Sequence, residues 1–310
     1  MRIAVIGVGG VGGYFGGKLA YAGNDVTFIA RGENLKALQS KGLTVKSFNG
    51  DFGVEKVNAT DNFGDISGAD LIIIGVKAWQ LKEVALQLKP VIADHTVVIP
   101  LQNGVIAVEE LQEVLPEKNI ILGLCRIISK IESPGVINHF GVDPVIIFGE
   151  TDNSLTPRLE KIKAVFDSSG INSKIPSDIQ SELWKKFITI CVSGLLAVSK
   201  TTYGELSELT ETRQMMIDLF NEIYVLSQKM GVFVPADFVD KTVAFIDSFP
   251  YDTTSSLTRD VLEGKPSEIE YQNGTVVKLG QKYGLDTPVN RFVYSCILPM
   301  EIRARGSRNA

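Results

Sequence analysis

A run of glycines near the N-terminus has the spacing of a phosphate-binding loop. The pattern G-x-G-x-x-G is formed by Gly7, Val8, Gly9, Gly10, Val11 and Gly12. In this pattern the first glycine makes a tight turn, the second lets the backbone approach a pyrophosphate, and the third lets a helix pack closely on a strand. The first N–H groups of that helix would face the phosphates. The run therefore predicts a phosphate site for a dinucleotide.

The segments on either side of the glycine run indicate whether it binds a cofactor, because a chain with 29 glycines can contain such a pattern by chance. Residues 2–8 are continuously apolar and rich in β-branched side chains, which is typical of a strand buried on both faces of a parallel sheet. Residues 14–21 then have a helical pattern. A loop between a buried strand and a helix favours cofactor binding over a glycine turn that serves packing alone.

Arg31 indicates which dinucleotide would bind. About 20 residues beyond the glycine run, an NAD site usually ends its second strand with Asp or Glu, which accepts from the ribose hydroxyls. This chain has Ala30 and Arg31 there. A guanidinium pairs well with a 2′-phosphate, so Arg31 favours NADPH. The alternative is that Arg31 is a solvated charge at the strand end and that Glu33 serves the ribose of NADH.

Strands and helices are expected to alternate along the first half of the chain, and they place these residues. Further strands are expected at residues 25–30, 69–76 and 96–101, with helices at 34–41 and 78–88. This alternation predicts an α/β fold with a doubly wound sheet of the Rossmann type. Arg31, Lys77 and Asn103 each follow a predicted parallel strand. They should therefore lie near the carboxyl edge of the sheet, where such folds bind ligands.

The second half of the chain has a different pattern. Closely spaced strands between residues 120 and 149 are expected to add to the sheet edge, mostly antiparallel. Helices follow at 177–200, 207–230, 235–248, 254–263 and 266–283. We expect a Rossmann domain at 1–175, an all-helical C-terminal domain at 176–302, and a disordered polar tail at 303–310.

Length and composition exclude several classes of protein. A chain of 310 residues suggests two domains. Its net charge of −5 argues against nucleic-acid binding, and no stretch reaches the roughly 18 apolar residues of a membrane helix. Cys125, Cys191 and Cys296 lack metal-ligand spacing and suit reduced thiols in the cytoplasm. We expect no metal, while a homodimer is left open.

Four further groups of residues resemble the ketopantoate reductase (2-dehydropantoate 2-reductase) family. They are Val76-Lys77-Ala78-Trp79-Gln80, Gln102-Asn103-Gly104, Glu182-Leu183-Trp184-Lys185-Lys186, and Ser255-Ser256 followed by residues 267–274. With the glycine run they extend over nearly the whole chain in the family's order. The resemblance implies NADPH-dependent reduction of a small 2-oxo acid to a 2-hydroxy acid, with 2-dehydropantoate, the precursor of pantoate in pantothenate biosynthesis, as the first candidate.

The resemblance also implies roles for individual residues. Lys186 would be the general acid, with Glu268 in support. The cofactor would contact the glycine run together with Arg31, Lys77, Gln80 and Asn103. The substrate would contact Asn103, Lys186, Ser256 and Glu268.

The helical pattern itself places Lys186 at the margin of an apolar face and Lys185 nearly opposite. Partial burial can lower the pKa of a lysine toward the working pH, although a lysine stem more often covers apolar surface while its amine reaches water. In the predicted helix at 266–283, Glu268 borders the buried side and Glu270 faces away. Glu268 could equally be a solvated acid at a helix start, and Ser256 a surface serine.

The chain departs from the family at the positions four and eight residues beyond Lys186. The family usually has asparagines there, and this chain has Ile190 and Gly194, with Ser193 as a partial replacement. Tyr203 stands where some members have a third asparagine. Fewer polar groups suit a more apolar 2-oxo acid. The alternatives are therefore a reductase of another substrate, such as an apolar 2-oxo acid or an imine, and a non-catalytic NADPH-binding regulator of the same fold.

Overall fold

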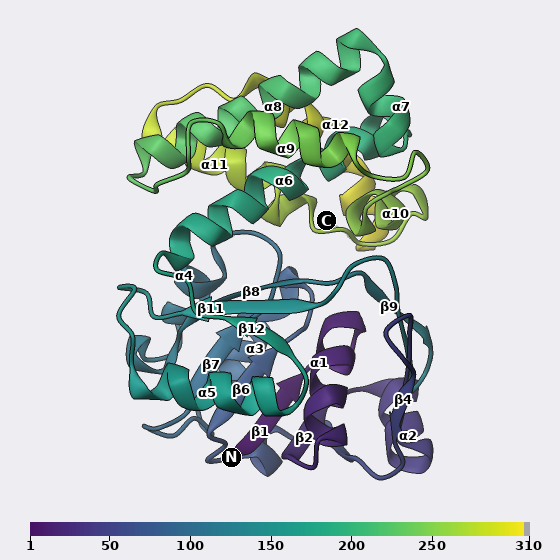
Figure 1. Ribbon diagram of the computed structural model, residues 1–310, viewed down its shortest axis with the longest axis vertical. Helices are drawn as coiled ribbons and strands as arrows, with labels where there is room; N and C mark the ends of the chain where they lie inside the picture. Colours follow the sequence, from purple (N-terminus) through teal and green to yellow (C-terminus); the bar gives the residue numbers. More distant parts are fainter. Residues whose placement is uncertain (307–310) are drawn as a thin grey trace. The chain divides into compact units, whose positions relative to one another are not determined.

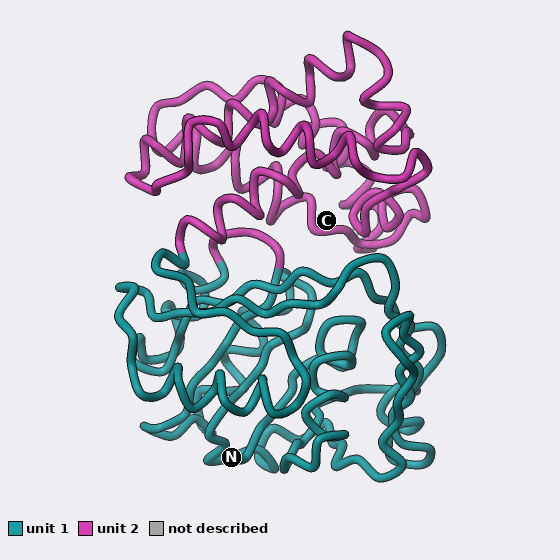
Figure 2. Tube along the Cα trace, viewed as in Figure 1, with its two compact units in different colours: residues 1–102, 107–179 teal, residues 103–106, 180–310 magenta. Residues whose placement is uncertain are grey.

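The computed structural model describes residues 1–306 and divides the chain into two compact units (Figures 1 and 2). The first unit contains residues 1–102 and 107–179. Among the described residues, the second contains 103–106 and 180–306. The division thus falls four residues beyond the expected boundary, where helix α6 (Ile179–Ser199) begins. The short segment 103–106 belongs to the second unit although it follows a strand of the first.

A five-stranded parallel sheet forms the centre of the first unit, with strand order β5-β2-β1-β6-β7. The strands are β1 (Arg2–Ile6), β2 (Asp25–Ile29), β5 (Asn58–Thr60), β6 (Leu71–Ile74) and β7 (Val97–Pro100). The helical segments between them are α1 (Gly10–Tyr21), α2 (Gly32–Lys41), η1 (Phe63–Ile66), η2 (Ala78–Gln80) and α3 (Leu81–Leu88). Every residue of β6 and β7 is buried, as expected of strands covered on both faces. The predicted α/β fold is confirmed.

The segment that begins at residue 120 reaches the edge of that sheet where Ile120 bridges Val98 of β7. Its strands nevertheless form two other sheets, so the prediction that they add to the sheet edge is wrong for the strands themselves. Strands β8 (Leu122–Arg126), β11 (Val145–Gly149) and β12 (Asn172–Lys174) form a separate three-stranded sheet. Strands β9 (Ser129–Ser133) and β10 (Val136–His139) join β3 (Leu43–Ser47) and β4 (Phe52–Val54) in a four-stranded one. The physical reason is that β3, which was not predicted, offers β10 a parallel partner from Thr44 to Ser47.

The rest of the first unit is helical. It consists of α4 (Ala107–Gln112), the turn η3 (Glu117–Asn119) and α5 (Pro157–Ser168). In α5, Leu159, Ile162 and Phe166 are buried at helical spacing and belong to the core of this unit.

The second unit is all-helical, as predicted. Its elements are α6, α7 (Tyr203–Glu208), α8 (Thr210–Lys229), α9 (Phe238–Asp247), α10 (Ser256–Leu262), η4 (Ile269–Tyr271), α11 (Asn273–Tyr283) and α12 (Pro288–Ala304). No helix within residues 1–306 is long and apolar enough to cross a membrane.

Two expectations about these helices are wrong. A single helix at 266–283 does not form, because Gln272 has φ −111° and ψ −103°, which separates the turn η4 from α11. Residues 303 and 304, expected in a disordered tail, are the last residues of α12, and Arg305 pairs with Glu301 one turn earlier at 2.6 Å. Residues 307–310 of the expected tail lie outside the described residues.

Candidate functional site

The glycine run joins β1 to α1, and its three pattern glycines differ in their surroundings. Gly7 has φ +88°, and a Cβ there would lie 2.6 Å from Val76 Cγ1. A Cβ on Gly12 would collide with the carbonyl oxygen of Gly7. By contrast, a Cβ built on Gly9 would meet no atom of the described chain within 4 Å beyond its own neighbours in sequence. The first and third glycines therefore serve the turn and the packing, and the backbone at Gly9 is open to a ligand.

Strand β9 passes beside the first turn of α1, which the sequence did not indicate. A Cβ on Gly10 would lie 2.5 Å from the carbonyl oxygen of Ser129 and 2.7 Å from its Oγ. The Ser129 hydroxyl is buried and has no hydrogen-bond partner among residues 1–306. Helix α1 has neither a side-chain cap nor an acidic residue in its first turn. An unpartnered hydroxyl beside uncapped N–H groups fits the pyrophosphate of a dinucleotide.

Arg31 lies two residues beyond β2, at the N-cap of α2, and its exposed side chain forms an ion pair. Its Nη2 lies 2.9 Å from Oε1 of Glu83 on α3. Glu33, the alternative ribose acceptor, accepts from the amine of Lys36 at 2.7 Å. Asn34 donates to the carbonyl of Val8 at 2.9 Å, so the start of α2 is tied to the glycine run.

Lys77 and Gln80 follow β6, as predicted, and both are half-buried. The Lys77 amine lies 5.8 Å from the ring centroid of Trp79. Gln102, which follows β7, donates from Nε2 to the carbonyls of Ile74 and Val76, both at 3.0 Å. Two of the motifs quoted above are thereby joined at the carboxyl edge of the sheet, where doubly wound folds bind ligands.

In the second unit, Asn103 and Glu268 are brought together although they are 165 residues apart. Asn103 Nδ2 donates to Glu268 Oε2 at 3.1 Å, and only 6% of Glu268 is exposed. Gly104 has φ +103°, and a Cβ there would lie 2.7 Å from the carbonyl oxygen of Tyr271. The Gln-Asn-Gly motif therefore meets the segment 267–274 directly.

The position of Glu268 depends on a buried carboxylate that the sequence did not indicate. Glu301 on α12 is 4% exposed, and its Oε2 accepts from both the backbone N and the Oγ of Ser267 at 2.7 Å. The interpretation of Glu268 as a solvated acid at a helix start is wrong, because it is buried and precedes η4. Glu270 was expected to face away, yet it is half-buried and accepts from Tyr294 Oη at 2.8 Å.

The two lysines of α6 differ less than the helical pattern predicts. Lys186 is half-buried beside the fully buried Phe187. Lys185 is not solvated: its side chain is 22% exposed and its amine lies 2.9 Å from Glu182 Oε1. The expectation of a solvent-facing Lys185 is therefore wrong, because an ion pair one turn away holds its amine on the helix.

The two missing asparagines have different structural consequences. Ile190 is half-buried and packs against the core of the second unit. At Gly194 a Cβ would collide with Asn273 Oδ1 and lie 2.6 Å from Val293 Cγ1. Asn273 itself donates to the carbonyl of Cys191 at 3.1 Å. Asn273 of α11 thus occupies the space beside Gly194.

Tyr203 and Ser193 are engaged with each other. Burial raises the pKa of Tyr203 to about 12, opposed in part by a hydrogen bond with the Ser193 side chain. Ser193 therefore has a protein partner for its hydroxyl. In the Ser255-Ser256 motif, Ser255 caps α10 by accepting from Thr258 N at 3.1 Å, and Ser256 is exposed.

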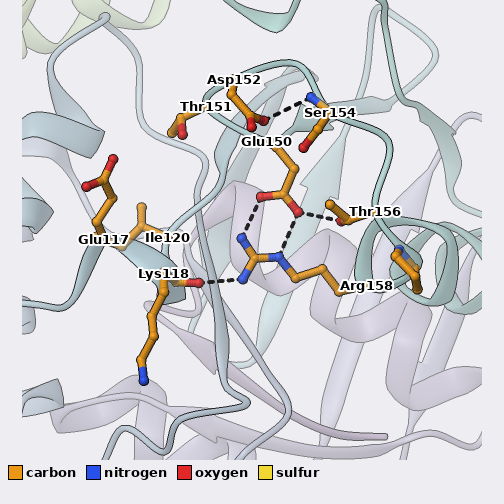
Figure 3. A pocket seen from close by; sticks show the side chains of 10 residues that line it. Glu117, Lys118, Ile120, Glu150, Thr151, Asp152, Ser154, Thr156 and Arg158 are labelled. Carbon is orange, nitrogen blue, oxygen red and sulfur yellow. Dashed lines mark hydrogen bonds and ion pairs between the residues drawn. The ribbon is translucent and has the colours of Figure 1, made fainter.

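An open pocket of about 410 Å³ in the first unit is lined by none of the predicted site residues (Figure 3). Its centre is an ion pair in which Arg158 donates to both oxygens of Glu150, at 2.7 and 2.5 Å. Thr156 donates to the same carboxylate, and the hydrogen bond with Glu150 raises the pKa of Arg158. These charges satisfy one another, which is typical of a structural clamp. Within residues 1–306, no three His, Cys, Asp or Glu side chains gather as metal ligands would.

A glycine loop at the carboxyl edge of a parallel sheet, followed by a helical unit with a lysine and a buried glutamate, defines a dinucleotide-dependent oxidoreductase. Residues 3–153 match the family described as ketopantoate reductase PanE/ApbA, and residues 178–301 match its C-terminal part. The chain belongs to the ketopantoate reductase family.

Two relatives are similar over almost their whole length. The uncharacterized oxidoreductase YkpB of Bacillus subtilis is 30% identical, covering 95% of this chain and 97% of the relative. A 2-dehydropantoate 2-reductase of Nostoc sp. is also 30% identical, covering 94% and 93%.

Two solved structures share the fold. A 2-dehydropantoate 2-reductase of Geobacter metallireducens has a TM-score of 0.90 at 27% identity, covering 96% of this chain and 99% of that one. A D-mandelate dehydrogenase with NADH and anilino(oxo)acetate has a TM-score of 0.88 at 23% identity, covering 98% and 100%. Enzymes with this fold therefore include one solved with NADH, and they are named for different substrates.

Proposed function

We propose that this protein reduces a 2-oxo acid to a 2-hydroxy acid with NADPH, and that 2-dehydropantoate is the first substrate to test. The observation that carries the proposal is the contact, within the second unit, between Asn103 and the buried Glu268, since two family motifs that are distant in sequence thereby place their polar side chains together. The named 2-dehydropantoate 2-reductases among the relatives support the same substrate.

The cofactor contacts belong to the first unit. The pyrophosphate would lie on the first turn of α1 at Gly9, with the Ser129 hydroxyl beside it. Arg31 would pair with the 2′-phosphate, and Lys77 and Gln80 would hold the ribose. When bound, the dinucleotide supplies a hydride, two electrons and one hydrogen nucleus, to the ketone carbon.

The substrate contacts belong to the second unit. Lys186 would donate a proton to the oxygen of the forming alkoxide, which completes the 2-hydroxy acid and leaves a neutral amine that water reprotonates. Glu268, held by Asn103 and by the Glu301 anchor on Ser267, would orient the substrate hydroxyl or the Lys186 amine. Ser256, exposed at the start of α10, is proposed to bind the substrate carboxylate.

A second candidate substrate class is a 2-oxo acid with an apolar tail. Ile190 favours it, because this half-buried side chain offers no hydrogen bond where the resembled family has an amide. The D-mandelate dehydrogenase of the same fold, solved with an aromatic oxo acid, is a precedent. The three cysteines, all among the described residues, are thiols and not disulfides, which suits the cytoplasm as the proposed location.

The decisive experiment follows oxidation of NADPH and of NADH with a panel of 2-oxo acids. The panel includes 2-dehydropantoate, 2-oxoisovalerate and phenylglyoxylate. Turnover of 2-dehydropantoate with NADPH is the expected result, and a preference for one of the apolar acids would select the second candidate. Nucleotide binding without any turnover would refute both and leave a non-catalytic regulator.

A further inference from the structure

The ion pair between Arg31 and Glu83 changes the chemistry of the site proposed for the 2′ position of the cofactor's adenosine. Both side chains are 56% exposed, and their charged atoms are 2.9 Å apart. Gln87, one turn further along α3, donates to the same Glu83 oxygen at 3.1 Å. The Glu83 carboxylate is thus held in place from its own helix while it contacts the guanidinium. A carboxylate is therefore present at the site, although the strand end itself carries none.

This carboxylate affects the two cofactors in opposite ways. A 2′-phosphate carries between one and two negative charges at neutral pH, so it competes with Glu83 for the guanidinium and is repelled by it. A free ribose hydroxyl is uncharged, and its proton can be donated to a carboxylate. NAD sites ordinarily obtain this acceptor from an acid at the end of the second strand. Here α3 would supply it instead.

We infer that Glu83 is a specificity-determining residue for the 2′ position of the adenosine ribose, and that it reduces the preference for NADPH that Arg31 creates. Glu83 does so by pairing with Arg31, so the free site is close to neutral instead of positive. The inference rests on the proposed function in requiring that a nicotinamide dinucleotide binds at the glycine run with its 2′ position at Arg31. It is independent of which substrate is reduced.

The test is Glu83→Gln, which removes the charge and keeps the size and hydrogen-bonding groups of the side chain. Calorimetry would measure the binding of adenosine 2′,5′-bisphosphate and adenosine 5′-monophosphate, which need no substrate. An exposed ion pair is a weak competitor, so we expect Glu83→Gln to bind the bisphosphate about two- to fivefold more tightly. Binding of the monophosphate should not become tighter and should weaken by less than about twofold, since its hydroxyl does not compete for Arg31 and can still donate to the amide oxygen of the new Gln. The gain should also shrink at high salt.

The matched control is Glu113→Gln. Glu113 is also 56% exposed and also forms an ion pair with α3, through Lys82 at 2.7 Å. This variant should leave the ratio of the two affinities unchanged, which would show that loss of a surface charge near α3 is not enough.

A second comparison tests the pairing itself. In an Arg31→Ala background, Glu83→Gln should lose most of its effect on binding of the bisphosphate, because no guanidinium remains to be released and only the direct repulsion of the phosphate is relieved. The inference is overturned by an unchanged affinity ratio in Glu83→Gln or by an equal change in both nucleotides. It is also overturned by an undiminished effect without Arg31, or by absence of nucleotide binding in the wild type. Failure of every 2-oxo acid with nucleotide binding intact would refute only the proposed substrate.

Discussion

Restoring the family's asparagines one at a time should give two different results. Ile190 is half-buried at the edge of the core, so an asparagine can replace it with modest loss of packing. A hydrogen bond to a hydroxyl that is otherwise buried without a partner is worth about 1 to 3 kcal/mol. Ile190→Asn should therefore raise kcat/KM for 2-dehydropantoate relative to 2-oxoisovalerate by about 5- to 150-fold.

Gly194→Asn should instead destabilise the protein. The new Cβ would collide with Asn273 Oδ1 and lie 2.6 Å from Val293 Cγ1, so α6 or α11 must move. Overpacking of this kind costs about 1 to 3 kcal/mol, which urea denaturation would measure. The relative activity on the two substrates should not rise.

The control for Ile190→Asn is Ile217→Asn, since Ile217 is another half-buried isoleucine that packs against the same core. It should lose similar stability and leave the substrate ratio unchanged. The reasoning is refuted if the wild type already reduces 2-dehydropantoate far better than 2-oxoisovalerate, or if Ile190→Asn leaves the ratio where it was.

Three other predictions concern turnover and stability. Lys186→Ala should lower kcat by about 10²- to 10⁴-fold with little change in nucleotide affinity. Lys185→Ala should keep kcat within about twofold. Equal losses of kcat in the two variants would contradict the general-acid role of Lys186. The folded state keeps the proton of Tyr203 up to about pH 12, so the wild type should lose about 2 to 3 kcal/mol of stability as the pH rises from about 10, the unfolded pKa, to about 12. Tyr203→Phe should weaken that alkaline loss, as measured by urea titrations at several pH values, and an unchanged pH dependence would refute it. Arg158→Ala leaves the 7% exposed Glu150 carboxylate without a cation, although Thr156 still donates to it, and should cost about 3 kcal/mol in urea denaturation. A loss below about 1 kcal/mol would show that the pair is not structural.

The elements that depend only on residues close together in the chain could be predicted from the sequence. The glycine run, the buried strands β1, β6 and β7, and the alternation of strands and helices follow from backbone preferences and from periodicity within a few residues. Alternation implies parallel strands, and their carboxyl ends share one edge. Arg31 and Lys77 could therefore be placed at the ends of β2 and β6 without any coordinates.

Contacts between side chains that are distant in sequence could be seen only in the tertiary structure. Asn103 and Glu268 are distant in sequence, and Ser267 depends on Glu301 of α12, a helix that the sequence analysis did not predict. The partner of Arg31 is Glu83, one of several exposed acids that no periodicity distinguishes. Such contacts arise from how packed elements are turned toward one another, and local spacing contains no information about that. The family and its type of reaction can therefore be predicted from the sequence, while cofactor and substrate selectivity depend on contacts that form only on folding.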